Sequence, residues 1–387
     1  MVYSKYNIFL HNFPKEHYVT IYNLYTKELI CIPEDLTLNG INKELAEKLN
    51  QKGMIVDFQQ AEEQNVLRHF YEVQDSKNEL SIVVLMTQKC NCHCIYCYEE
   101  GGILDGTDVI DIEKIYEFIV SYVMKWGYKK VNIVYYGGEP LLNKKMIFTL
   151  SEKLESKFED NFCFDIVTNG TLLEADDVQR WTELGLRRIK VTIDGCETSH
   201  NLRRKLKNGE NAYTLILNNL SKISGMVDIL INIVVDDEVY GIEKMIDDLA
   251  DRNIKAKFSI SIREPDDYGS QKKADIILEN TKILAKKGVY QYSKIGENHG
   301  IICSGKKNNC LTVDAQNNIY YCNGNFSFIA QLNENSMIKK DYFLDKNCKE
   351  CKYLPICYGG CRFSHRCQKE YFELVVPELL RIYIKEK

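Results

Sequence analysis

Fifteen cysteines make metal or cluster binding the chemistry to test first in this chain of 387 residues. Three of them, Cys90, Cys94 and Cys97, lie on one short segment, separated by three and two residues. Three thiolates can converge on one [4Fe-4S] cluster and leave one iron open for chemistry. A structural zinc site is the alternative, with Cys92 or His93 helping to complete four ligands.

A second group of cysteines lies near the C-terminus and is large enough for two four-cysteine sites. Its members are Cys303, Cys310, Cys322, Cys348, Cys351, Cys357, Cys361 and Cys367. Two structural zincs are the alternative, but zinc ribbons usually pair two Cys-x-x-Cys knuckles, and only Cys348 with Cys351 forms one here. Iron-sulfur clusters are the preferred interpretation.

The composition excludes several classes of function. A net charge of -5 provides no basic field for nucleic acid or an anionic membrane. No stretch reaches the roughly 18 uncharged apolar residues that a membrane span needs, and the first residues are too polar for a signal peptide. We therefore expect a cytoplasmic protein, whose thiols stay reduced and serve as ligands instead of forming disulfides.

The middle of the chain must position the first cysteine group, and its pattern is that of an α/β fold. Apolar runs at 81–86, 131–136, 164–168, 188–193, 229–235 and 256–262 alternate with amphipathic stretches such as 112–125, 144–157 and 242–251. Six βα units either close partly into a barrel or form an open doubly wound sheet. Cys90, Gly137, Asn169 and Asp194 follow the first four strands, so the carboxyl ends of the strands are the candidate site.

Two flanking regions complete the predicted organisation: 1–77, 78–290 and 291–387 are the expected domains. The first is a small β-β-α-β-α module, winged-helix-like, with strands at 18–25 and 29–32, a helix at 43–49, an extended segment at 54–57 and a helix at 62–72. After about residue 290 we expect cysteine-punctuated loops that need something inorganic to hold them.

Charge runs such as Asp236 with Glu238 and Lys272 with Lys273 are expected on solvated faces. The segment 371–383 predicts an amphipathic helix that is interrupted by Pro377 and packs on the body.

The first cysteine group, with Tyr96 just before its last member, resembles the cysteine motif of the radical S-adenosylmethionine (SAM) superfamily. The resemblance implies a partial (β/α)6 TIM-like barrel in which Cys90, Cys94 and Cys97 hold the catalytic cluster. Its open iron would bind SAM, whose reductive cleavage gives a 5'-deoxyadenosyl radical that takes a hydrogen atom from the substrate. Tyr96 would lie against the adenine.

Further segments extend this resemblance along the strands. Gly137, Gly138, Glu139 and Pro140 match the glycine-rich motif that contacts the SAM ammonium group, and the Glu139 carboxylate suits a cation. By resemblance, Asn169 lies near the ribose, Thr192 and Asp194 belong to the next strand end, and Arg204 pairs the SAM carboxylate. Turn chemistry alone is the alternative for Asn169-Gly170 and Asp194-Gly195. Asn201 departs from the family, which commonly has Asp there.

The second group resembles the SPASM extension, whose cysteines hold two auxiliary [4Fe-4S] clusters. Matching by order assigns Cys303, Cys310, Cys322 and Cys361 to an inner cluster and Cys348, Cys351, Cys357 and Cys367 to an outer one. Either Cys303 or Cys310 can match the first position, and Asn317 stands where the family usually has Gly. If one thiol is spare, the inner cluster keeps an open iron for a substrate cysteine.

The expected substrate is a ribosomally made precursor peptide. Sulfatase maturases of this family have a general-base Asp after the cysteine that matches Cys322, but Asn323 stands here and an amide takes up no proton. The N-terminal module resembles leader-recognition domains, and an exposed strand there would capture a leader peptide by β-augmentation; a mere folded extension or dimer contact is the alternative. The expected reaction is thioether or carbon-carbon crosslinking, with electrons from a flavodoxin or ferredoxin-type donor. Formylglycine formation and a non-catalytic role in electron transfer or redox sensing are the alternatives.

Overall fold

The computed structural model describes residues 1–36, 40–97, 111–263, 268–289, 303–332, 338, 342, 344–361, 363 and 366–385. The chain divides into two compact units. The first unit consists of Met1–Gln74, Glu264–Cys303 and Asp341–Lys387, and the second of Asp75–Arg263 and Ser304–Lys340. Segments from both ends of the chain thus share one unit, whereas the sequence suggested three consecutive domains.

The second unit is built on a nine-stranded sheet in the order β13-β12-β10-β9-β8-β6-β14-β15-β16. Its parallel part contains all six predicted strands: β6 (Glu79–Leu85), β8 (Lys130–Tyr136), β9 (Phe162–Thr168), β10 (Leu186–Thr192), β12 (Asp228–Val235) and β13 (Lys257–Ile262). These six follow one another in chain order, so the sheet is wound in one direction and is not doubly wound. The carboxyl ends of all six strands therefore meet at one edge.

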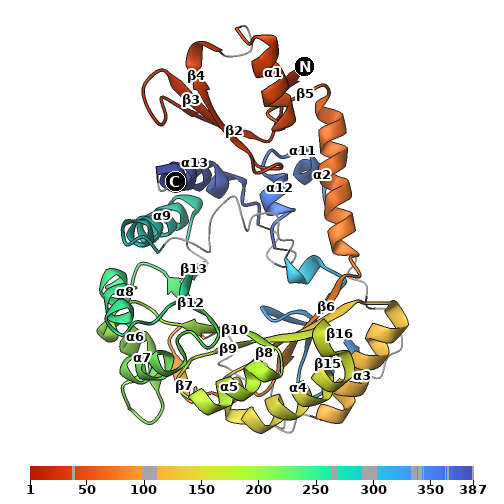
Figure 1. Cartoon of the computed structure of the whole chain (residues 1–387), viewed down its shortest axis with the longest axis vertical. Coiled ribbons are helices and arrows are strands. Elements are labelled where there is room, and N and C mark those ends of the chain that lie inside the picture. Colours follow the sequence, from red (N-terminus) through yellow and green to blue (C-terminus); the bar gives the residue numbers. More distant parts are fainter. Residues whose placement is uncertain are drawn as a thin grey trace. The chain divides into compact units, whose positions relative to one another are not determined.

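Helices cover one face of this sheet, as Figure 1 shows for α3, α4, α5 and α7. The helical segments are α3 (Ile112–Trp126), η2 (Pro140–Asn143), α4 (Lys144–Phe158), η3 (Glu159–Asn161), α5 (Ala175–Glu183), α6 (Glu197–Arg203), α7 (Ala212–Ile223) and α8 (Ile242–Asp251). Successive strand residues point to opposite faces. Ile133 and Tyr135 of β8 are fully buried toward the helices, and the Tyr135 hydroxyl contacts Ser151 Oγ of α4 at 2.8 Å.

The sheet continues beyond the predicted strands. After η4 (Ser304–Lys306), β14 (Cys310–Val313) pairs in parallel with β6, and β15 (Asn318–Cys322) and β16 (Asn325–Gln331) extend the sheet in antiparallel fashion. The expectation of loops in this region was therefore wrong for residues 310–331. Asn317 precedes β15 with φ of +66°, which explains why Gly or Asn suits this position.

The first unit combines the N-terminal module with the C-terminal segments. Its elements are β1 (Val2–Tyr3), β2 (Asn7–His11), β3 (Tyr18–Asn23), β4 (Leu29–Pro33), η1 (Glu34–Leu36), α1 (Lys43–Gln51), β5 (Ile55–Val56), α2 (Gln59–Gln74), α9 (Ser270–Lys286), α11 (Lys346–Glu350), α12 (Leu354–Cys357) and α13 (Lys369–Lys385). Strands β1 and β2 were not predicted. Helix α13 runs through Pro377 without a break, so the predicted interruption was wrong, but its apolar side does pack on the unit.

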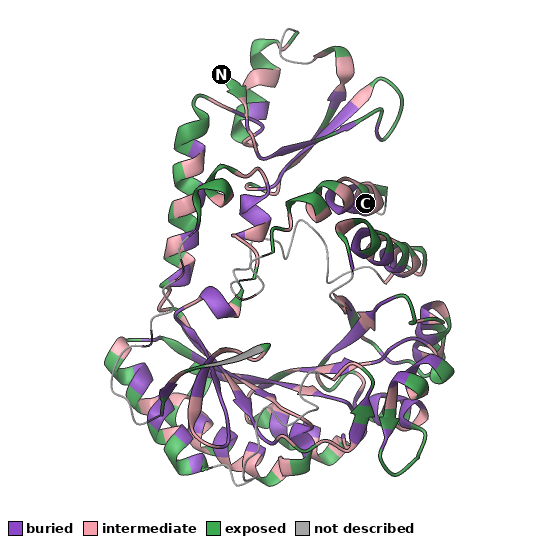
Figure 2. Cartoon of the chain, turned by 180° about the vertical axis from the view of Figure 1, so that it is seen from behind, coloured by how far each residue is buried: buried purple, intermediate pink, exposed green. Residues whose placement is uncertain are grey.

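Two hydrophobic clusters, one on each side of a small sheet, hold the first unit together. The antiparallel sheet β2-β3-β4 is covered on one side by α1 and β5, where Val19 and Ile21 meet Leu49. On the other side, Tyr22 and Leu24 share a core with α2, α12 and α13. The burial colours of Figure 2 show the result, with β3 buried along its length.

Two expectations about the whole chain can be checked on the described residues. All fifteen cysteines lie among them, and none forms a disulfide bond. No helix within the described ranges is sufficiently long and apolar to cross a bilayer.

Candidate active site at the carboxyl edge of the sheet

The first cysteine loop leaves β6 and is fixed by backbone pairing within the second unit. Its short strand β7 (Cys92–Cys94) pairs with β11 (Arg204–Leu206), which follows α6. The Ile95 amide also donates to the carbonyl of Arg203 at 2.9 Å. Cys90, Cys92, Cys94 and Cys97 pack in one cluster around Leu206 and Ala212. The fold therefore brings the three predicted cluster ligands together.

The two glycines that follow β8 allow the end of this strand to pack closely against the cysteine loop, which follows β6. The Gly138 amide donates to Thr87 O at 2.8 Å and the Glu139 amide to Lys89 O at 2.9 Å. A Cβ atom at Gly137 would lie 2.4 Å from Thr87 O, and one at Gly138 would lie 2.4 Å from Lys89 O. Gly137 also has φ of +122°, a conformation that other residues rarely adopt. These glycines support the cysteine loop, a role the sequence did not reveal.

The thiols in this cluster are electrostatically unequal. The Cys92 thiol donates to Cys90 and so lowers the pKa of Cys90, whereas burial raises the pKa of Cys94 to about 11, with Cys90 and Cys97 adding to the rise. Iron binding requires the thiolate, so ligation would add to the positive charge of Arg204, which already favours the Cys94 thiolate. Among the described residues, no three His, Cys, Asp or Glu side chains are placed to hold a single metal ion.

Glu139 is fully buried between two strand ends. Its Oε1 accepts hydrogen bonds from the Leu141 amide at 3.0 Å and Thr168 Oγ1 at 2.7 Å, and its Oε2 accepts from the Asn169 amide at 2.8 Å. Burial raises the pKa of Glu139 to about 7. The side chain caps η2, whose first residue is Pro140, and an arriving cation would favour its ionised form.

Asn169 joins the end of β9 to the cysteine loop. Its Nδ2 donates to Asn91 Oδ1 at 2.7 Å and lies 3.9 Å from Cys90 Sγ. Its Oδ1 accepts from the Thr171 amide at 3.0 Å, which is the turn chemistry that the sequence offered as the alternative. Both interpretations of Asn169 are thus compatible with its position beside a predicted cluster ligand.

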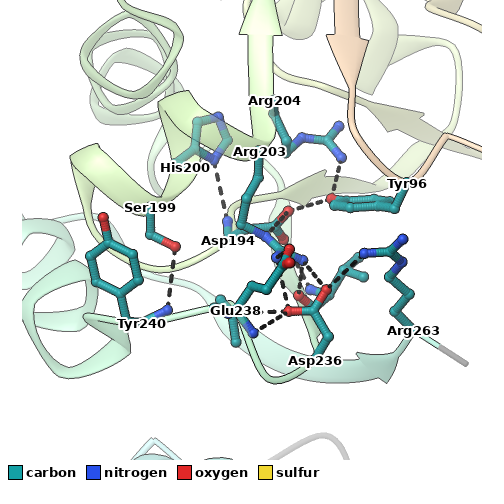
Figure 3. A network of polar contacts seen from close by, with 12 residues as sticks. Tyr96, Asp194, Ser199, His200, Arg203, Arg204, Asp236, Glu238, Tyr240 and Arg263 are labelled. Atoms are coloured by element: carbon teal, nitrogen blue, oxygen red, sulfur yellow. Dashed lines mark hydrogen bonds and ion pairs between the residues drawn. The ribbon is translucent and has the colours of Figure 1, made fainter. Parts of the chain in front are cut away.

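A polar network links Tyr96 to the end of β10 (Figure 3). The Tyr96 hydroxyl donates to Asp194 Oδ2 and accepts from Arg204 Nη1 at 2.7 Å. Asp194 is fully buried, and its Oδ1 accepts from the Val234 amide at 3.0 Å. Arg204 Nε is buried without a hydrogen-bond partner among the described residues, so this guanidinium retains a donor for an anion. Thr192, the last residue of β10, is partly exposed.

The same network contains a buried ion pair that the sequence did not predict. Arg203 donates to both oxygens of Asp236, with Nη1–Oδ1 and Nη2–Oδ2 distances of 2.8 and 2.9 Å. Arg203 and Asp236 are each 3% exposed, so the expectation that Asp236 lies on a solvated face was wrong. Lys273, 5% exposed, was also wrongly expected in solvent. No spacing pattern connects Arg203 with Asp236, because their contact depends on the pairing of distant segments.

The C-terminal cysteines are divided between the two units. Cys310 and Cys322 lie on β14 and β15 of the second unit, whereas Cys303 and Cys361 belong to the first. Within the first unit, Cys348, Cys351, Cys357, Cys361 and Cys367 line a cavity of about 1090 Å³. The cavity is lined by one thiol more than a four-thiolate cluster needs, and Cys361 is the additional one in the predicted assignment. The assignment of these cysteines to an inner and an outer cluster stays a prediction.

Residues 84–249 match the model of the radical SAM superfamily. A probable GTP 3',8-cyclase of Methanococcus aeolicus is 30% identical over 166 residues, which are 42% of this chain and 52% of the relative. This chain thus spans about half the length of that curated relative.

Two solved structures resemble the fold over most of the chain. Native anSMEcpe with bound AdoMet has a TM-score of 0.62 at 18% identity and covers 80% of this chain and 100% of its own. Streptococcus suis SuiB bound to precursor peptide SuiA has a TM-score of 0.52 at 14% identity and covers 93% and 95%. With the cysteine loop at the carboxyl edge of a parallel sheet, the family match leads to one conclusion: residues 84–249 form a radical SAM domain.

Proposed function

We propose that this protein is a radical SAM peptide maturase that binds a precursor peptide and forms a thioether or carbon-carbon crosslink in it. One observation carries the proposal: the structural similarity to SuiB bound to its precursor peptide covers 93% of this chain. The similarity therefore extends well beyond residues 84–249. A related structure of anSMEcpe also holds a peptide together with AdoMet. Both likenesses include segments outside the radical SAM region.

The residues of the carboxyl edge have separable roles in this proposal. A [4Fe-4S] cluster on Cys90, Cys94 and Cys97 would supply the electron that cleaves SAM and so generates the hydrogen-abstracting 5'-deoxyadenosyl radical. Glu139 would take the SAM ammonium group, and the free Nε donor of Arg204 would take its carboxylate. Tyr96, Asn169, Thr192 and Asp194 would orient the nucleoside, and the buried surroundings would keep water from the radical.

The first unit would supply peptide recognition and further clusters. Strand β3 is paired on both sides, whereas the outer edge of β4 (Leu29–Pro33) has no strand partner among the described residues. An extended leader peptide would add to that edge by main-chain hydrogen bonds. Cys348, Cys351, Cys357 and Cys367 would hold an outer auxiliary cluster in the cavity, and an external flavodoxin or ferredoxin-type protein would supply electrons.

Formylglycine formation is the second candidate, and one residue weighs against it. Asn323 would have to serve as the general base, but its amide cannot take up a proton. Asn323 with Gly324 forms the turn between β15 and β16, which accounts for its presence without a catalytic role.

The test is co-expression with any small open reading frame beside the gene, followed by peptide mass spectrometry. A loss of two hydrogens per modification supports crosslinking, whereas aldehyde formation from cysteine loses sulfur and epimerisation leaves the mass unchanged. A parallel assay uses GTP as the substrate. Formation of a cyclised nucleotide would indicate that this protein has the cyclase activity named for its curated relatives. An unmodified peptide with ready SAM cleavage would overturn the maturase proposal.

A further inference from the structure

The inner face of the parallel sheet carries a lysine in the middle of a strand. On β10, Ile189 and Val191 are fully buried toward the helices, so Arg188, Lys190 and Thr192 point to the opposite face. Lys190 is paired with Val167 of β9 and Leu230 of β12, and it is partly exposed. The register neighbours of Lys190 on β9 and β12 are therefore apolar, whereas the polar residues Arg188 and Thr192 flank it along β10.

Lys190 differs from the neighbouring cations in having no partner. Arg187 and Arg188 both bind the buried Asp165 carboxylate, at 3.1 and 2.6 Å. Arg203 binds Asp236, and Arg204 binds Tyr96. No described residue forms a hydrogen bond or ion pair with the Lys190 ammonium group. Desolvation lowers the pKa of Lys190, and the nearby Arg188 charge lowers it further. An anion beside Lys190 would relieve both effects.

Asn232 offers a second donor on the adjacent strand. It pairs with Thr192, one side-chain step along from Lys190, and is 5% exposed. Its Oδ1 accepts from Ser259 Oγ at 3.0 Å and Ser261 Oγ at 2.8 Å. Two hydroxyl groups thereby orient the amide, and its Nδ2 donates to no described residue. A buried amide oriented in this way is suited to recognise an anionic oxygen.

We propose that Lys190 and the Asn232 amide form a subsite on the inner face of the sheet that holds a carboxylate of the substrate peptide. The inference rests on the proposed peptide maturase function and names a chemical feature of its substrate. The Lys190 ammonium group matches one negative charge, not the several charges of a nucleotide triphosphate, and the other lysine of this row, Lys257 beside Leu230, is already paired with Asp228. Lys190 lies two residues, roughly 7 Å, below the strand end at Thr192, so the carboxylate is held beneath the edge where SAM would bind.

The functional test compares Lys190→Met with wild type as full-length, reconstituted enzyme acting on its precursor peptide. Removing a charged hydrogen-bond donor should raise the KM for the peptide at least about tenfold. Peptide-independent release of 5'-deoxyadenosine and the KM for SAM should stay within about twofold of wild type. Lys257→Met is the matched control, because Lys257 is half exposed on β13 of the same sheet and forms an ion pair with the exposed Asp228 at 2.9 Å.

A second variant guards against a folding artefact. Asn232→Asp places a carboxylate next to Lys190 and should raise the KM for the peptide as Lys190→Met does, with unchanged iron content. If Lys190→Met raises the KM for SAM instead, the subsite belongs to the cofactor and the inference is overturned.

The source of the carboxylate is found by replacing each acidic residue of the peptide with its amide and by amidating the C-terminus. The amide substitution that removes the bound carboxylate should raise the KM of the wild-type enzyme for the peptide. It should raise the KM of Lys190→Met no further, because the peptide change and the enzyme change delete the same interaction. Equal additional losses for every amide would contradict a single bound carboxylate.

A substrate-free measurement separates this inference from the proposed function. In crystals soaked with bromide, an anomalous peak should lie beside Lys190 Nζ in wild type and be missing in Lys190→Met. A bromide peak without any peptide modification would leave the anion subsite standing and remove the maturase proposal. If the peptide is modified but wild type shows no bromide peak and Lys190→Met has no effect, the maturase proposal stands and the anion subsite is overturned.

Discussion

The two cysteine regions are supported in different ways. The loop of Cys90, Cys94 and Cys97 is fixed by main-chain bonds to the ends of two other segments, with Gly138 against Thr87 and Ile95 against Arg203. In the described part of the segment from Cys348 to Cys367, Tyr353, Leu354 and Tyr358 are buried in the core of the first unit, whereas the cysteines line a cavity of about 1090 Å³. We infer that the first region keeps its shape without a cluster, whereas the second depends on the group that fills the cavity.

The largest expected effect is the loss of SAM cleavage in Cys94→Ala. Without its third thiolate, the first site cannot hold the cluster that supplies the electron, so 5'-deoxyadenosine should fall to the assay background under anaerobic reduction. The unfolding temperature should change by less than about 2 °C, since the loop is held by its backbone. Cys163→Ala, at another thiol of the same unit, should retain the activity. If Cys94→Ala is unfolded, the first cysteine region also depends on its cluster for stability, which would contradict the inferred difference between the two regions.

The next effect concerns the stability of the first unit in Cys351→Ala. Cys351 packs against the core that contains Tyr6 and Tyr353, and losing a cluster ligand there should destabilise the unit by more than about 3 kcal/mol. Limited proteolysis should then cleave the N-terminal module as well as the C-terminal segment, because they share a core. Cys31→Ala, at an exposed thiol on β4, is the control and should leave the digestion pattern of wild type. Resistance of Cys351→Ala to protease would show that the cavity needs no filling.

Gly138→Ala tests the protein support of the first loop. The added Cβ would lie 2.4 Å from the Lys89 carbonyl oxygen, so backbone must move, at a cost of about 3 kcal/mol in unfolding free energy. Chemical denaturation measures this cost, and iron content should drop with it because the ligand loop is displaced. Gly269→Ala provides the comparison for added volume alone, since nothing lies within 4 Å of a Cβ there and its φ of -72° is one that alanine adopts. Equal losses in both variants would contradict a specific contact.

The smallest effect is expected from Tyr6→Phe in the core of the first unit. The Tyr6 hydroxyl is buried and has no hydrogen-bond partner among the described residues. Removing an unsatisfied polar group should raise the unfolding free energy by roughly 0.5–1 kcal/mol. A clear loss of stability, measured by denaturant unfolding, would mean that the hydroxyl forms an interaction that stabilises the core of the first unit.

The sequence by itself determined the parts of this protein that depend on local pattern. The six parallel strands follow from runs of apolar residues, and the cysteine loop follows from the spacing of Cys90, Cys94 and Cys97 after the first strand. Such features depend on neighbours in the chain, so one sequence suffices to predict them.

Only the tertiary structure decided which distant segments meet. Strand β14 pairs with β6 across more than two hundred positions, Asp236 is buried because Arg203 faces it, and the N-terminal strands share a core with α13. Strand β2 was missed because it alternates over only five residues and exposes Phe9. These contacts stabilise the fold through burial and charge pairing between remote residues, and no local spacing records such pairs.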